Sequence, residues 1–271
     1  MKELLRRLLL MEKVPQGPVV LQISGESEPF FCVFLGKNPR EMMIYEGAEG
    51  WLSYEGLKMA NEDSPEGFTA FYRQKGIQIT VGASGIRAIS WQPGRIPEPL
   101  EEYSMLIPFL EAILDSIQSP QEVAIKPQAP AYGYGNQLKL HRIKKLPQKP
   151  VAWEALQFFS SPKVWDQGLK SELLGAVTLM VAPGDNRLVF QDITPAKAEN
   201  LSQIPDKLAD NFLERGYFPK SLVVGDLYLQ GILLDFCFQL GIGCVVGPVQ
   251  TAQNFRNELV GYLPVCGALG S

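Results

Sequence analysis

One carboxylate, Asp226, lies where many α/β proteins bind a ligand. Ser221-Leu-Val-Val-Gly225 is short and apolar, as a buried strand is, and Asp226 follows it directly. In open α/β sheets, ligands bind beyond the carboxyl ends of the parallel strands, close to helix N-termini. A carboxylate there could hold a divalent cation or a sugar hydroxyl. Asp226 could equally be a helix N-cap, because Asp accepts hydrogen bonds from the free amides of the first turn.

The predicted ligand site comprises Gly225, Asp226 and Gly247, because Gly247 ends the neighbouring strand. A metal-dependent hydrolase would need further acids at the same point. Asp192 follows another predicted strand, whereas Asp235 lies nine residues beyond Asp226 on the same predicted helix, about two and a half turns away. These acids form no recognisable motif, and we predict no metal and no cofactor.

A basic segment is the sharpest charge feature of the chain. Its cations could contact an anion or a nucleic acid, with Tyr132 and Tyr134 nearby to stack on bases. The alternative is a solvated linker whose lysines keep an edge strand from pairing with other chains. The candidate residues are Lys139, Arg142, Lys144 and Lys145. With a formal charge of −4 and a pI near 5.3, the whole chain is unlike a general nucleic-acid binder.

Histidine and cysteine usage narrows the possible chemistry. His141 is the single histidine, which excludes multi-histidine zinc and iron sites. We expect it on the surface of a strand over Gln137–Ile143. No G-x-S-x-G nucleophile elbow occurs, and no glycine pair precedes a helix as a phosphate loop requires. The four cysteines show no C-x-x-C spacing, which is typical of buried thiols in a reducing compartment.

The elements that position Asp226 form a strand–helix–strand unit over residues 221–247. A nearly apolar stretch, Leu227–Leu240, separates two short apolar segments. Two neighbouring strands joined through a helix run parallel, and the crossover is right-handed in nearly all folds. Before this unit, the sequence predicts a hairpin over Ala176–Phe190 and a helical region from Thr194 to about Arg215.

The first half shows a similar order of elements. A leucine-rich helix opens the chain, and several strands follow, among them Phe68–Arg73 and the hairpin Ile77–Trp91. A helix over about Leu100–Gln118 comes next. Hairpin, helix, proline and strand thus recur at an offset near 100 residues, which predicts an internal duplication.

The predicted fold is α+β or mixed α/β, with two related modules that each contain a mixed sheet and packed helices. The second module contains the parallel strand–helix–strand unit. We place the modules at 1–147 and 148–271, because a proline-bearing connection, Pro127–Pro150, ends near that point.

Two segments resemble an uncharacterised bacterial two-module family of unknown function. The first is Glu28-Pro-Phe-Phe-Cys-Val-Phe-Leu-Gly36, followed by Ile44–Gly50 and Tyr54. The second runs from Phe218-Pro-Lys-Ser-Leu-Val-Val-Gly-Asp226 through Leu240–Val246. The resemblance covers most of the chain and implies two modules. It implies no catalytic residue.

Composition limits the function. A chain of 271 residues with 46% hydrophobic residues can bury a substantial core, and its apolar runs are too short to span a bilayer. The leucine-rich start has the spacing of a docked amphipathic helix rather than of a signal peptide. We therefore expect a soluble cytoplasmic protein that binds an unknown protein or small molecule without catalysis, and no membrane. The alternative is a small-ligand or metal-dependent hydrolase with its site near Asp226.

Overall fold

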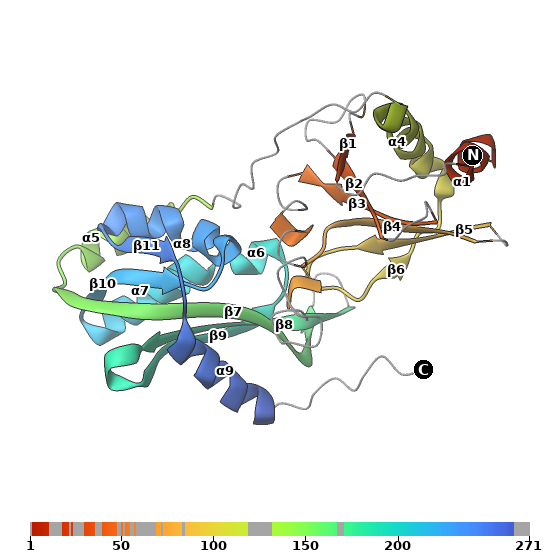
Figure 1. Cartoon of the computed structure of the whole chain (residues 1–271). Helices are drawn as coiled ribbons and strands as arrows, with labels where there is room; N and C mark the ends of the chain where they lie inside the picture. The colour runs from red at the N-terminus through yellow and green to blue at the C-terminus, as the bar shows by residue number, and fades with distance from the viewer. Residues whose placement is uncertain are drawn as a thin grey trace. The chain divides into compact units, whose positions relative to one another are not determined.

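The structure is a computed structural model, and it describes residues 2–10, 18–21, 23, 30–35, 40–47, 50, 52–54, 57, 69–71, 73–82, 85–118, 132–166 and 171–262. The chain divides into two compact units, Met1–Gln128 and Ala129–Ser271. Each unit contains a β-sheet and packed helices, so the predicted α+β class is confirmed (Figure 1).

The first unit contains a six-stranded antiparallel sheet whose strands are neighbours in chain order. Side chains alternate between the two faces of a strand, and both faces of this sheet are apolar. One face packs against α1 (Lys2–Leu9) and α4 (Ile107–Gln118), and the other contains Phe31, Tyr45 and Trp91. The strands are β1 (Val19–Leu21), β2 (Phe30–Phe34), β3 (Glu41–Glu46), β4 (Gly76–Gly82), β5 (Gly85–Trp91) and β6 (Glu98–Pro99). A 3-10 turn, η1 (Tyr103–Leu106), precedes α4.

Two sequence-based predictions for the first unit are wrong. The sheet is antiparallel throughout rather than mixed, since each strand pairs in antiparallel register with the next strand along the chain. Residues 69–71, predicted to lie in a strand, are helical. The strand that the repeated pattern predicts after the helix of the first half, at Glu122–Ile125, falls outside the described residues. The duplication stays a prediction.

The second unit contains a five-stranded mixed sheet in the order β11-β10-β7-β8-β9. The central strand β10 runs parallel to both neighbours, and Leu222 faces Cys244 on one side and Trp153 on the other. The predicted parallel strand–helix–strand unit is therefore confirmed. The strands are β7 (Gln148–Asp166), β8 (Ser171–Ala182), β9 (Arg187–Pro195), β10 (Phe218–Val224) and β11 (Gly243–Val246), with a 3-10 turn η2 (Pro183–Asp185) between β8 and β9.

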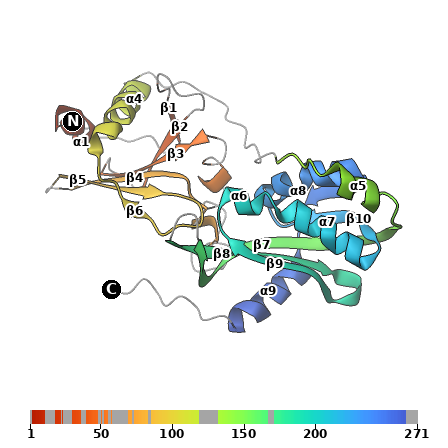
Figure 2. The same cartoon turned by 180° about the vertical axis from the view of Figure 1, so that it is seen from behind.

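Helices cover both faces of this second sheet (Figures 1 and 2). The helix α9 packs against β7 and β8 on one face, where Leu156, Val177 and Ala252 are part of an apolar core. On the other face, α7 and α8 pack against each other and against the sheet, and α5 packs on both of them. The helices are α5 (Gln137–Ile143), α6 (Ala198–Leu201), α7 (Ile204–Arg215), α8 (Leu227–Leu240) and α9 (Gln250–Tyr262).

The segment Gln137–Ile143 is the helix α5, and the predicted strand is wrong. Its alternation of leucine and polar residues resembles a strand, but Leu140 and Ile143, three residues apart, are the buried pair. The Asn136 side chain caps the helix by accepting a hydrogen bond from the Lys139 amide at 3.2 Å. Because α5 packs on α7 and α8, the second unit begins before the predicted boundary at residue 147.

The longest strand, β7, has no counterpart among the predicted elements. Pro150 near its start favours a loop, since proline cannot donate to a sheet ladder. In the structure this proline lies where the pairing of β7 with β10 shifts register, between Lys149 and Ala152, so no regular ladder bond is lost.

Candidate functional site

Asp226 is the N-cap of α8. Its backbone is extended, with φ −153° and ψ 166°, and its Oδ1 accepts a hydrogen bond from the Leu229 amide at 2.8 Å. A carboxylate in this position also interacts favourably with the positive end of the helix dipole. In the structure, Asp226 therefore acts as the N-cap of α8.

The two glycines of the predicted site allow close packing of the strand ends. A Cβ on Gly225 would lie 3.0 Å from Leu156 Cδ1, and one on Gly247 would lie 3.2 Å from Val223 Cγ1. Their amides donate to the carbonyls of Ala155 and Val224, each at 3.0 Å. The close packing of the neighbouring strands therefore accounts for glycine at both positions.

A second carboxylate, Glu154, caps the neighbouring helix. Its Oε2 accepts from the Ala252 amide at 2.9 Å, and its Oε1 accepts from the Thr251 hydroxyl at 3.2 Å. Since β10 and β11 are parallel, the helices that follow them begin at the same edge of the sheet. Both N-termini, where an anionic ligand would bind in such folds, are occupied by carboxylates of the chain itself.

The other acids considered for a metal site are engaged elsewhere. Asp192 accepts two bonds from the Lys207 amine, at 2.7 and 2.8 Å. Asp235 accepts from the Tyr134 amide at 2.7 Å and from Gln239 at 2.8 Å. Within the described part of the chain, no three His, Cys, Asp or Glu side chains are grouped so as to hold a metal ion.

Substitutions at Asp226 distinguish a helix cap from a catalytic carboxylate. We expect Asp226→Ala to lower the free energy of unfolding by about 1 kcal/mol, and Asp226→Asn to leave it nearly unchanged, because Asn caps helices as well as Asp. Urea denaturation of both variants measures this difference. Equal destabilisation by the two substitutions would contradict the capping role.

The basic segment separates into one paired and three unpaired cations. The Lys139 amine lies 2.7 Å from both Asp206 Oδ2 and Asp210 Oδ1, and its side chain is only 19% exposed. Arg142, Lys144 and Lys145 are exposed and form no ion pair among the described residues. Of the four predicted anion contacts, only these three have a charge available to a partner.

Asp206 joins the segment before α5 to the rest of the unit. It accepts hydrogen bonds from the Tyr134 hydroxyl at 2.9 Å, the Asn136 amide at 3.1 Å and the Lys139 amine at 2.7 Å. Burial raises the pKa of this carboxyl, but these three bonds and the Lys139 charge outweigh it, so the pKa lies below its usual range. The Tyr134 ring packs edge-on against Phe236, 4.9 Å between centroids. The cluster holds α5 against α7 and α8.

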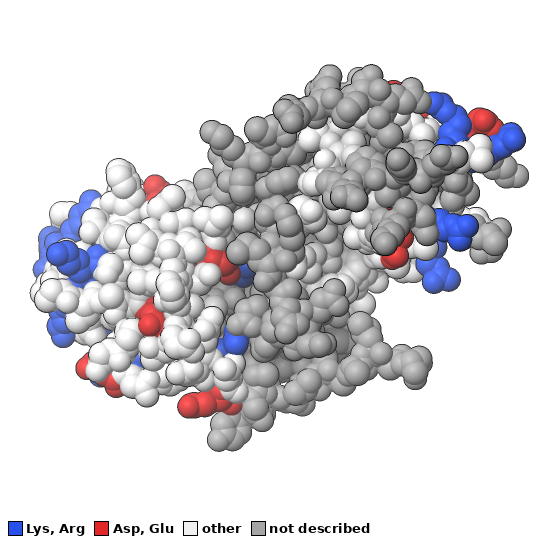
Figure 3. Space-filling view, in the orientation of Figure 1, with Lys and Arg blue, Asp and Glu red and all other residues white. Residues whose placement is uncertain are grey.

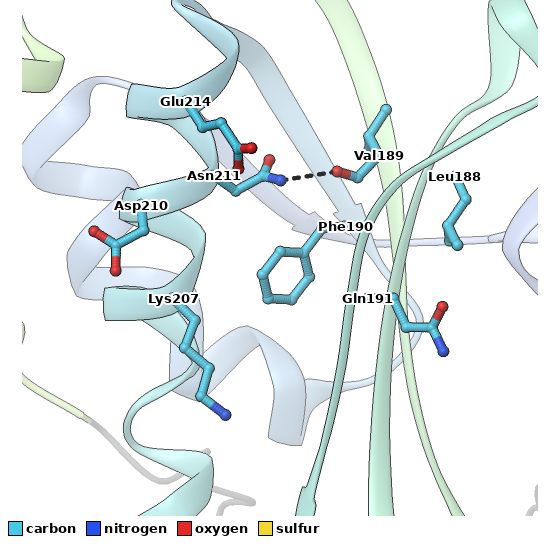
Figure 4. A pocket seen from close by; sticks show the side chains of 8 residues that line it. All are labelled: Leu188, Val189, Phe190, Gln191, Lys207, Asp210, Asn211 and Glu214. Carbon is cyan, nitrogen blue, oxygen red and sulfur yellow. Dashed lines mark hydrogen bonds between the residues drawn. The ribbon is translucent and has the colours of Figure 1, made fainter.

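A groove of about 310 Å³ lies between β9 and α7 (Figure 4). Its polar groups bond across it: the Asn211 amide donates to the Val189 carbonyl at 3.1 Å, and Arg215 donates to the same oxygen at 2.6 Å. These bonds attach α7 to β9, an edge strand of the sheet, at Val189, where the pairing of β9 with β8 shifts register. The groove is lined by Leu188, Val189, Phe190, Gln191, Lys207, Asp210, Asn211 and Glu214.

The outer face of α8 exposes large apolar side chains. Phe238 is 81% exposed, Leu234 is 49% exposed and Leu227 is 39% exposed. These residues are spaced by seven and four, so they form one stripe along the helix, opposite the buried Leu229 and Phe236. We call Leu227, Leu234 and Phe238 the α8 stripe. The sequence shows α8 as apolar on all sides and does not reveal which side is open.

The apolar surface continues beside the α8 stripe. Leu138 of α5 is 71% exposed, and the preceding residue, Gln137, donates a hydrogen bond to Gln239 of α8 at 3.4 Å. On the other side, β11 is an edge strand with Val245 and Val246 exposed. Figure 3 shows a largely uncharged face over α8 and β11, with basic side chains at its margin.

A family model without a known activity matches most of the second unit. A domain of unknown function (DUF6930) covers residues 139–260, from within α5 to near the end of α9. This confirms the expected resemblance to a family of unknown function for the second unit. A solved structure, that of the hypothetical protein CT021 from Chlamydia trachomatis, is 17% identical over 67% of this chain and 81% of that chain, with a TM-score of 0.19. No curated protein matches the chain.

Proposed function

We propose that this chain is a non-catalytic protein-interaction module that binds its partner through the α8 stripe and the adjoining side chain of Leu138. The observation that supports it most directly is the 81% exposure of Phe238 on a helix whose opposite face is in the core. A cytoplasmic location is part of the proposal, supported by the unbridged thiols of Cys32, Cys237 and Cys244.

Several large apolar side chains on one helix face are unusual on the surface of a soluble chain. Isolated exposed leucines are common, but contiguous apolar surface marks a site of association. Leu234 and Phe238 are separated by one helical turn, so one partner could cover both. An aromatic side chain such as Phe238 also has the large apolar area that dominates interface energetics.

Charge near the stripe indicates the chemistry of the partner. Lys144 and Lys145 lie four and three residues before β7, and Gln148 at its start donates to the Gly241 carbonyl at the end of α8, at 3.2 Å. Two cations that form no ion pair among the described residues therefore lie near the end of α8 that bears Phe238. A complementary partner is a protein segment with apolar side chains flanked by Asp or Glu, since opposite charges favour encounter and fix orientation.

A positional cross-linking experiment tests the proposal. A photoreactive phenylalanine analogue is placed at Phe238, at Leu234 and, as a control, at Ile193 of the full chain expressed in its source cells. Ile193 is 51% exposed but lies on β9, the opposite edge strand of the sheet. We expect the same protein to be captured from positions 238 and 234 and not from 193.

The captured protein must then bind the purified chain through an acidic and apolar segment. Capture of different proteins from the two α8 positions, or equal capture from Ile193, would contradict the proposed surface. Nucleic acid in the adducts in place of protein would also contradict it.

A further inference from the structure

Two cysteines of the second unit, Cys237 and Cys244, lie on neighbouring elements. Cys237 lies in the last turn of α8, and Cys244 lies on β11. The two elements pack against each other, and each thiol shifts the pKa of the other. The turn between them is tight: Gly241 has φ +69°, and the Ile242 amide donates to the Cys237 carbonyl at 2.9 Å. This helix end returns the chain alongside α8, so that β11, which carries Cys244, packs against the helix that carries Cys237.

A second bond fixes the register of β11 against α8. Gln230 lies seven residues before Cys237 and therefore on the same face of the helix. Its side-chain amide donates to the backbone carbonyl of Cys244 at 3.1 Å. Cys237 and Cys244 therefore lie on the two sides of a defined helix–strand interface.

The two thiols differ in access to solvent. Cys237 is fully buried, whereas Cys244 is partly exposed. Interaction with the Cys237 thiol lowers the pKa of Cys244 despite burial, which acts in the opposite direction. Interaction with the Cys244 thiol, together with burial, raises the pKa of Cys237. The accessible sulfur is thus the one that ionises first, as an attacking thiol requires.

We propose that Cys237 and Cys244 form a redox-active dithiol, which is converted to an intramolecular disulfide by exchange with a low-molecular-weight disulfide such as oxidised glutathione. The proposal rests on the packing of α8 against β11 and is independent of the α8 stripe.

The exchange takes place in two steps. The Cys244 thiolate attacks one sulfur of oxidised glutathione, so that a mixed disulfide forms and one glutathione leaves and takes up a proton. The Cys237 thiol then loses its proton and attacks the Cys244 sulfur, which releases the second glutathione. In the net reaction two protein thiols are oxidised and one glutathione disulfide is reduced to two thiols.

A single tryptic peptide reports the reaction. No Lys or Arg lies between Lys220 and Arg256, so the peptide Ser221–Arg256 contains both cysteines and neither Cys32 nor Cys266. The reduced full chain is incubated with oxidised glutathione below its unfolding temperature, alkylated, digested and weighed by mass spectrometry. We expect this peptide to lack both alkyl groups, to be lighter by two hydrogens than the reduced peptide, and to return to the reduced form with dithiothreitol.

Serine variants assign the two roles. In Cys237→Ser, glutathione should accumulate on Cys244, because the resolving thiol is absent. In Cys244→Ser, modification of Cys237 should be at least about tenfold slower than that of Cys244 in the unmodified chain, because Cys237 is buried. Circular dichroism checks that each variant folds. If a variant does not fold, the mass of the wild-type peptide after incubation with oxidised glutathione alone tests the proposal.

Two results would overturn the proposal. One is a wild-type peptide that remains alkylated at both cysteines after incubation with oxidised glutathione. The other is a stable glutathione adduct on the wild-type peptide, since Cys237 would then fail to resolve it.

Discussion

Substitution of Phe238 by aspartate should weaken binding of the cross-linked partner about 100-fold, equivalent to roughly 2.7 kcal/mol. The substitution removes a large aromatic side chain from the proposed interface and puts a charge there that would lose water on binding. The effect on folding should stay within about 0.5 kcal/mol, because the Phe238 side chain is exposed in the free protein. Isothermal titration calorimetry with the purified partner measures the affinity.

The matched control is Ile193→Asp, which makes the same kind of change on the opposite edge of the sheet. We expect it to leave the affinity unchanged. Reversal of charge at Lys144 and Lys145 should mainly slow association and weaken its dependence on salt. Equal losses from Phe238→Asp and Ile193→Asp would show that the α8 stripe is not the binding surface.

Replacement of Asp206 by alanine should lower the free energy of unfolding of the second unit by about 3 kcal/mol. The substitution removes an acceptor shared by Tyr134, Asn136 and Lys139. The buried Tyr134 hydroxyl then loses its partner, which costs more than the bond itself contributes. Urea denaturation, combined with hydrogen exchange of residues 132–143, measures the loss and locates it.

Asp210→Ala is the control, since Asp210 contacts the same Lys139 amine but its side chain is 62% exposed. It should cost less than about 1 kcal/mol, as surface ion pairs do. Similar losses from both substitutions would mean that the additional hydrogen bonds of Asp206 to Tyr134 and Asn136 contribute little.

Acid should remove the contribution of Asp206. Burial raises the pKa of this carboxyl, but the hydrogen bonds and the Lys139 charge lower it further, to below its ordinary value. The folded state therefore binds its proton less readily than the unfolded chain, whose Asp pKa is about 3.9. The stability difference between the wild type and Asp206→Ala should be constant above about pH 5 and shrink as pH falls below about 4. A difference that grows in acid would contradict the lowered pKa.

Local signals made the strand–helix–strand unit predictable. Asp226 and Gly241 mark the two ends of α8, and both are capping residues whose effect depends on the backbone nearby. The basic segment was different. Its leucine–polar alternation matches a strand, yet Asn136 and the bonds of Tyr134 and Lys139 to Asp206 stabilise a helix instead. These partners lie about 70 residues away, where local pattern gives no information.

The sequence by itself determined the α+β class and the parallel unit, and it indicated a helix cap as one of two roles for Asp226. Only the tertiary structure decided which similar residues are available to a partner. Phe236 and Phe238 lie two residues apart on an apolar helix, and one is buried while the other is 81% exposed. Lys139 is paired, whereas Lys144 forms no ion pair within the described part of the chain, and Cys237 and Cys244 lie on packed elements joined by a turn. Helical periodicity places residues on opposite faces, but packing against distant elements determines which face is covered.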